Sequence, residues 1–188
     1  MRVGTKSTHG RVRALVRVTA AAGVLLLSPI MGPAMAADLD DAAIVAIYNQ
    51  VNSIDIETAL LGEVMGYSED VRALARMVAN DHTGVRQAAH DLALDIGVTP
   101  DLPAARAAAA QAHYKTIADL RTKSGAGFDQ AYLLHEIAFH DAAAKAVRTV
   151  LLPAAKSPEL KAHFEAVLPH FEHHLAETIR VAKKLGYQ

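Results

Sequence analysis

The chain of 188 residues contains no cysteine and no tryptophan. The absence of cysteine excludes a disulfide framework, a lipidation site behind an export signal and a cysteine nucleophile. The sequence also lacks the Gly-x-Ser-x-Gly motif of hydrolases, a glycine-rich phosphate-binding loop and the His-Glu-x-x-His motif of metalloproteases. These absences argue against the common enzyme classes and favour a protein that is not an enzyme.

Long hydrophobic runs are scarce as well, and the one that stands out lies near the N-terminus. Residues 1–17 carry five basic side chains and no acidic one, an apolar run covers 18–30, and "PAMAAD" follows. This order predicts a signal peptide, residues 1–36, cleaved after Ala36. The alternative is a retained N-terminal anchor, although the run is short for a bilayer crossing. We therefore expect an exported protein, periplasmic or secreted, with residues 37–188 as a single domain and no transmembrane segment after cleavage.

Positive charge is also in short supply once the signal peptide is removed. Losing its five basic residues takes the formal net charge from -1 to -6. This balance argues against nucleic acid or an anionic membrane surface as the main partner. A protein of the cell envelope remains an open alternative as partner.

No stretch shows the strict apolar–polar alternation of a half-buried strand, so the sequence predicts an all-α fold. Turn signals separate helices expected at about 40–66, 69–96, 104–123 and 158–184, with another that holds Asp129 in its first turn and reaches about Leu152. Ser68 and Ser157 are the expected N-caps, and Pro158 suits a first helical position. The four long helices carry apolar residues at alternating steps of three and four. This pattern predicts a four-helix bundle with the third, shorter helix as a connector.

Three histidines interrupt these apolar seams. His82, His140 and His174 each occupy a seam position on a different long helix. A buried imidazole without a partner costs about 1–3 kcal/mol, so each needs a hydrogen bond, a carboxylate or a cation. One interpretation is a site for a single transition-metal ion, with Zn, Fe, Mn or Cu all suited to such ligands. The alternative is a hydrogen-bonded polar core that fixes the register of the helices.

Carboxylates and further histidines flank these three positions. Glu136 stands four residues before His140 and His170 stands four residues before His174, a spacing that places both members of a pair on one helix face. The candidate metal ligands are Glu57, Asp81, His82, Glu136, His140, His170 and His174. No special role is expected for His90, His113, His135 or His163. His173 is expected to be solvated.

Pro169 lies about eleven residues inside the last predicted helix. A proline there removes one backbone hydrogen bond and predicts a kink one turn before His174. The kink either widens the bundle beside the histidines or is a tolerated surface feature.

Three segments carry a family resemblance: "IETALLGEVMGYSEDVRALARMVANDHTGVRQAAHDLALDIGV" at 56–98, "GFDQAYLLHEIAFHDAA" at 127–143 and "LPHFEHHLAETIRVAKKLG" at 168–186. Together they resemble the bacterial exported family known as domain of unknown function 4142, often labelled a predicted outer membrane protein. The resemblance implies a ferritin-like helical bundle outside the cytoplasm, without an established activity.

The sequence departs from di-iron bundles, which use a Glu-x-x-His motif on each of two helices. No such motif lies on a seam here, and Glu136 and His140 are four residues apart. We therefore do not expect a ferroxidase or an oxygenase. Two classes of function remain: a metal-binding protein of envelope metal handling or stress defence, and a structural or interaction module of the envelope.

Overall fold

The structure, a computed structural model, describes residues 39–187. The predicted signal peptide, residues 1–36, lies outside the described residues. Within residues 39–187 every regular element is helical, which confirms the all-α prediction. None of the helices in this range combines the length and the apolar character needed to span a bilayer.

Four long helices and one shorter helix make up the fold. Their bounds are α2 (Asp41–Met65), α3 (Glu69–Asp95), α4 (Ala107–Arg121), α5 (Gly125–Ala146) and α7 (Pro158–Lys184). A 3-10 turn, η2 (Ala104–Arg106), precedes α4, and a π-helical segment, η3 (Val147–Leu151), joins α5 to the short α6 (Leu152–Ala154). The sequence predicted one helix up to about Leu152 but not its wide π-helical turn.

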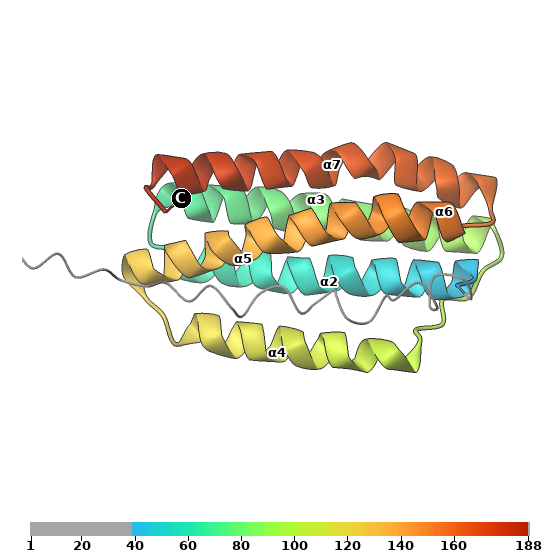
Figure 1. Ribbon diagram of the computed structural model, residues 1–188, viewed down its shortest axis with the longest axis horizontal. Coiled ribbons are helices and arrows are strands. Elements are labelled where there is room, and N and C mark those ends of the chain that lie inside the picture. Colours follow the sequence, from blue (N-terminus) through green and yellow to red (C-terminus); the bar gives the residue numbers. More distant parts are fainter. Residues whose placement is uncertain (1–38, 188) are drawn as a thin grey trace, which may run out of the picture.

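The long helices form a bundle of two antiparallel pairs, α2 with α3 and α5 with α7 (Figure 1). α2 pairs with α3, α5 pairs with α7, and the two hairpins meet where α3 contacts α7 and α2 contacts α5. α4 lies outside this bundle, against α2 and α5, and carries the chain from the end of α3 back to the start of α5. The predicted bundle of four long helices with a connecting fifth helix is confirmed.

The predicted capping residues begin their helices as expected. The hydroxyl of Ser68 accepts a hydrogen bond from the backbone N–H of Val71 at 3.1 Å, and that of Ser157 accepts one from Leu160 at 3.2 Å. Pro158 follows Ser157 at the first helical position, where its missing N–H leaves no partner unsatisfied.

Asp129 has a different place from the predicted one, because α5 begins four residues earlier, at Gly125. Its buried carboxylate accepts hydrogen bonds of 2.7 and 2.9 Å from two successive backbone N–H groups of the α2–α3 turn. Asp41, in the first turn of α2, accepts two such bonds, of 2.8 and 2.9 Å, from the turn before α7. Each helical hairpin is therefore held at its turn by a carboxylate of the other hairpin.

The apolar core is divided into two clusters along the bundle. One cluster surrounds Tyr48, Phe164 and Phe171, and the other surrounds Phe128 and Tyr132. Every long helix passes from one cluster to the other, and at that level the buried side chains are polar. The members of this polar layer are Asn52, Asp55, Thr58, His82, Glu136, His140, His174 and Thr178.

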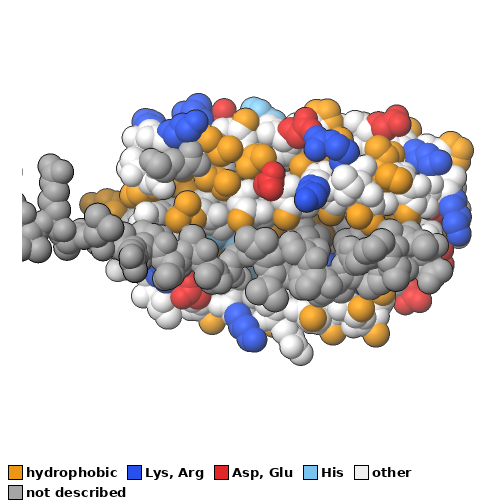
Figure 2. All heavy atoms as spheres, viewed as in Figure 1, with side chains coloured by type: hydrophobic (Ala, Val, Ile, Leu, Met, Phe, Trp, Pro, Cys, Tyr) orange, Lys and Arg blue, Asp and Glu red, His pale blue; other side chains and the backbone are white. Residues whose placement is uncertain are grey.

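Pro169 lies exposed within α7, and the helix continues on both sides of it. On the surface of the bundle drawn in Figure 2, acidic and basic side chains are interspersed with apolar ones. The exposed face of α7 thus carries Pro169, while its buried face carries His174.

Candidate metal centre

Three of the predicted histidines meet in the polar layer, one from each of three helices. His82 comes from α3, His140 from α5 and His174 from α7, and each is at most 2% exposed. Each offers a ring nitrogen, and these three nitrogens lie within 4.8 Å of one another. The fourth helix, α2, contributes Asp55, which is 1% exposed.

The hydrogen bonds of His82 determine which of its nitrogens faces the cluster with a free lone pair. Its Nδ1 lies 2.8 Å from Oδ1 of Asn52. The amide nitrogen of Asn52 donates to the carbonyl of Tyr48 at 2.8 Å, which fixes Oδ1 as the atom directed at His82. An amide oxygen only accepts, so Nδ1 of His82 carries the proton. A neutral imidazole has one N–H, and Nε2 therefore keeps its lone pair.

The other two histidines are oriented in the same way. Nδ1 of His140 donates to the backbone carbonyl of Glu136 at 3.0 Å, and Nε2 of His174 donates to Oδ2 of Asp81 at 3.0 Å. When these rings are neutral, the remaining nitrogens, Nε2 of His140 and Nδ1 of His174, keep their lone pairs. Histidines that bind a metal almost always donate their second nitrogen to a carbonyl or a carboxylate in this manner.

The inward atoms lie close together in three pairs, and Asp55 contacts two of the three histidines. Oδ2 of Asp55 is 2.9 Å from Nε2 of His82 and 3.2 Å from Nε2 of His140, and Nε2 of His82 is 3.1 Å from Nδ1 of His174. Ligands placed tetrahedrally at about 2.0–2.1 Å from a zinc ion would be roughly 3.3 Å apart. Electron-rich atoms at these distances repel one another unless a cation or protons lie between them.

Asp55 is the anionic centre of the cluster. Burial opposes its ionisation, but the charges of His82 and His140 outweigh burial and hold the pKa of Asp55 well below its ordinary value. The same interaction acts on His140: burial lowers its pKa, yet the charge of Asp55 gives a net increase. Burial lowers the pKa of His174 to about 4. Asp55 is therefore ionised and His174 is neutral near pH 7.

Glu136 stands beside this centre as a second buried carboxyl group. A carboxylate oxygen of Asp55, one of Glu136 and a nitrogen of His140 form a second group within 4.8 Å. Burial, and then the charge of Asp55, raise the pKa of Glu136 well above its ordinary value. Glu136 is thus a neutral acid next to an anion, and it becomes a further oxygen ligand only if it loses its proton.

Two of the predicted ligands lie outside the cluster. Glu57, predicted as a candidate ligand, is exposed, and its Oε2 is 2.8 Å from Nε2 of His113 in α4, so the structure does not bring it to the three histidines. Two residues correspond to about 200° around a helix, so with Asp55 facing the core, Glu57 faces α4. His170 is exposed on α7 and belongs to neither group of converging ligands within residues 39–187. Asp81, 45% exposed, supports His174 from behind.

Sequence reasoning missed Asp55. It lies one residue after the seam position of Ile54. The seam prediction assumed that α2 is buried along a single stripe. In the structure α2 is covered by α3, α4 and α5, so residues beside the seam are buried as well. The available signal was a lone acidic residue between two isoleucines, in "SIDIE" at 53–57.

Comparison with known protein families places the chain. A family model described as "Domain of unknown function (DUF4142)" matches residues 28–181. The chain belongs to this family. The matched range includes all four inward ligands of the DUF4142 protein as well as Glu136. No curated protein and no solved structure gave a significant match. Membership of this family alone assigns no chemistry to the site.

The donor set fits a first-row transition metal. Three imidazole nitrogens and one carboxylate oxygen suit Zn, Fe, Mn or Cu, whereas Mg and Ca prefer oxygen ligands alone. One carboxylate charge against a divalent ion leaves a net charge of about +1. Buried dipoles, such as the carbonyl that accepts a hydrogen bond from His140, point their negative ends towards the site. The cluster therefore contains the types of ligand that such an ion requires.

Proposed function

We propose that this DUF4142 protein binds one transition-metal ion in the core of its bundle, through Asp55, His82, His140 and His174. One observation carries the proposal. Each histidine has one nitrogen committed to an acceptor, the other three nitrogens lie within 4.8 Å of one another, and two of them contact a carboxylate that burial alone would keep neutral. A bound metal ion requires nitrogen atoms from several helices to converge on one point. Separate hydrogen bonds in the core require no such convergence.

We further propose that residues 37–188 form one exported domain that handles metal or defends against metal stress in the cell envelope. The predicted signal peptide supports the location, and the buried site supports retention of an ion rather than its rapid exchange. The absence of the common catalytic motifs favours binding over catalysis.

Elemental analysis of untagged protein purified from the periplasm tests this function. We expect close to one equivalent of Zn, Fe, Mn or Cu, and a melting temperature that falls after chelation, because an ion bound only by the folded state stabilises that state. His174→Ala should remove the ion without unfolding the protein. His173→Ala is the matched control, since His173 is the exposed neighbour of His174 in α7 and should leave the metal content unchanged.

Metal-free wild-type protein with a melting temperature insensitive to chelator would contradict the proposal. So would an unchanged metal content in His174→Ala.

The second candidate function is a structural or interaction module of the envelope. The observation in its favour is that a proton on His140 also neutralises Asp55, so the layer can exist as an ion pair that sets the register of the helices. This function predicts that an envelope extract passed over the immobilised protein yields one specific partner. Recovery of no such partner would count against it.

A further inference from the structure

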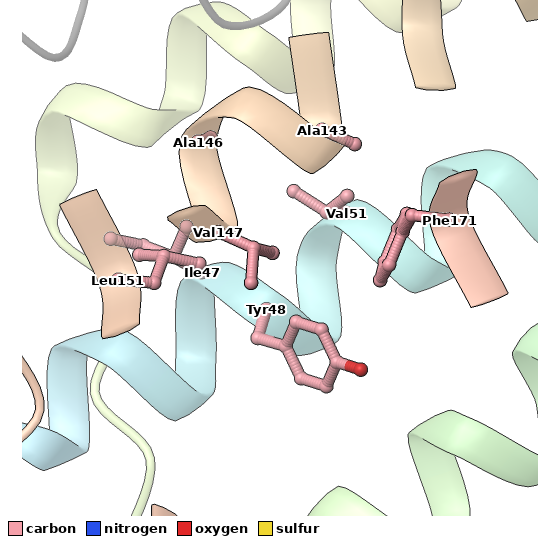
Figure 3. Close-up of a pocket in the computed structure, with 8 residues that line it drawn as sticks. All are labelled: Ile47, Tyr48, Val51, Ala143, Ala146, Val147, Leu151 and Phe171. Atoms are coloured by element: carbon pink, nitrogen blue, oxygen red, sulfur yellow. The ribbon is translucent and has the colours of Figure 1, made fainter. Parts of the chain in front are cut away.

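Two hollows in the described part of the chain differ in size and in lining. The cavity beside η3, of about 10 Å³, is apolar except for the phenol of Tyr48 (Figure 3). It is about the size of a single water molecule. A second hollow is an open groove of about 300 Å³ between α2 and α3. Its volume lies at the lower end of the range found for sites that bind small molecules.

Polar side chains line this groove throughout. Asn49 comes from α2, and Thr83, Arg86, Gln87 and His90 come from α3, so two helices present polar groups to one shared space. Arg86 is the residue of the lining with a permanent positive charge, and none of the five lining residues is acidic. The charge of the groove therefore favours an anionic ligand.

Arg86 is held in the groove by the neighbouring helix. Its Nη1 donates to Oγ of Ser53 in α2 at 3.0 Å, and Ser53 donates in turn to the backbone carbonyl of Asn49 at 2.8 Å. Within residues 39–187 four other arginines pair with a carboxylate, whereas Arg86 does not. The remaining N–H groups of Arg86 are available to a carboxylate, whose two oxygens match the planar guanidinium.

Two oxygen atoms of the lining call for hydrogen-bond donors on a ligand. Oδ1 of Asn49 is buried and has no hydrogen-bond partner among the described residues, which is destabilising. The terminal torsion of an asparagine side chain is soft, so Oδ1 can turn towards a ligand in the groove. The hydroxyl of Thr83 donates its proton to the backbone carbonyl of Ala79 at 2.7 Å, so its oxygen is left as an acceptor. Hydroxyl groups of a ligand would satisfy both oxygens.

The alternative is that the groove is ordinary solvated surface. Asp91 supports this alternative, because it accepts a hydrogen bond of 2.8 Å from Gln87 and lies 3.6 Å from His90, which reduces the positive charge on that side. A solvated surface accounts for the exposed side chains of the lining. It does not account for the buried oxygen of Asn49 that is left without a donor.

We propose that the groove between α2 and α3 binds a small hydroxylated carboxylate. Arg86 binds the carboxylate of the ligand, and Oδ1 of Asn49 and Oγ1 of Thr83 accept hydrogen bonds from its hydroxyl groups. This site is distinct from the proposed metal centre, because none of the four proposed metal ligands lines the groove.

Binding of gluconate tests the proposal, since this molecule combines one carboxylate with several hydroxyl groups. It is added to metal-free, isotope-labelled protein, and the side-chain amide signals of Asn49 and Gln87 are followed by NMR. Both signals should shift and saturate. Sorbitol has the hydroxyl groups without a carboxylate, and hexanoate has a carboxylate without hydroxyl groups. Each should bind at least about tenfold more weakly than gluconate.

Substitutions in α3 locate the binding site. Arg86→Gln removes the charge of the groove and should weaken the binding of gluconate about tenfold, which corresponds to about 1.4 kcal/mol. Arg76→Gln is the matched control, because Arg76 is an arginine of the same helix that pairs with Glu69. This control should bind gluconate as tightly as the wild type.

The outcomes separate the groove from the metal centre. Absence of a saturable shift with gluconate overturns the proposal, and so does an unchanged affinity in Arg86→Gln. Equally tight binding of sorbitol or hexanoate overturns the assigned class of ligand. The comparison of the three molecules uses the wild type alone, so it stays valid if Arg86→Gln does not fold. Binding of gluconate by a protein that binds no metal ion would support the groove and overturn the metal centre alone.

Discussion

Asp55→Asn tests the electrostatic account of the polar layer, because it removes the charge and nearly preserves the shape. In the metal-free protein, Oδ2 of Asp55 lies 2.9 and 3.2 Å from nitrogens of His82 and His140, and all three side chains are buried. Removing one partner of a buried ion pair costs about 3–5 kcal/mol. Near pH 7 His140 can release its proton instead, so we expect about 3 kcal/mol, the lower end of this range.

The pH dependence of this effect has a definite sign. The raised pKa of His140 contributes stability that is complete below 6.5, its ordinary value, and is lost as the pH rises through the folded-state pKa. The lowered pKa of Asp55 contributes stability that is present above 3.8 and is lost as the pH falls through its folded-state pKa. Asp55→Asn should therefore be most destabilising between these two values. From pH 6.5 to 5 its additional cost is about 2 kcal/mol, because the unfolded variant then binds a proton that the folded variant does not.

Urea unfolding in the presence of chelator, followed by circular dichroism at pH 7 and pH 5, measures both effects. At about 2–4 °C per kcal/mol, the melting temperature at pH 7 should fall by about 6–12 °C. Asp81→Asn is the matched control: its side chain is 45% exposed, and its loss should cost less than about 1 kcal/mol. If metal-free Asp55→Asn unfolds like the wild type at both pH values, Asp55 is not the charged centre of the layer and the electrostatic account is wrong.

Four further substitutions test other parts of the structure. Burial lowers the pKa of His174 to about 4, so the metal-free wild type should lose about 3 kcal/mol of stability from this group as the pH falls from 6.5 to 4. In urea titrations His174→Gln should lose less stability over this range. An equal dependence of stability on pH in both proteins would contradict a neutral His174. Gly62→Ala would place a Cβ 2.6 Å from ring carbons of Tyr132 and should cost about 1–3 kcal/mol in thermal melts, whereas Gly84→Ala, with open space around it, should stabilise α3 by up to about 1 kcal/mol. Asp129→Ala removes two hydrogen bonds from the α2–α3 turn and should cost about 3 kcal/mol, with faster hydrogen exchange at that turn; unchanged exchange would refute its role.

The helices and the polar layer could be predicted because their signals are local. Ser68 and Ser157 mark helix starts by side-chain chemistry that acts within three residues. His82, His140 and His174 stood out because each replaces an apolar residue in a regular repeat. Their meeting then follows from the antiparallel pairing of helices joined by short turns.

Whether the remaining site residues are buried depends on how much of each helix its neighbouring helices cover. No local sequence signal contains this information. α4 packs against α2 and α5, and Asp55, His113 and His135 are buried although none of them lies on a predicted apolar seam. The sequence reasoning assigned no role to His113 or His135, and the contact of His113 with Glu57 appears only once the connector is placed. The contact of Glu57 with His113 could not be predicted for the same reason.

The reciprocal carboxylates at the two ends of the bundle have a consequence for folding during synthesis. Asp129 holds the turn between α2 and α3, yet it follows that turn by about 60 residues in the chain. Asp41 precedes the turn that it holds by about 115 residues. A chain that emerges from the ribosome N-terminus first therefore cannot complete its first hairpin until α5 has appeared. The two halves should fold in one cooperative transition, and an isolated N-terminal half should lack an ordered turn.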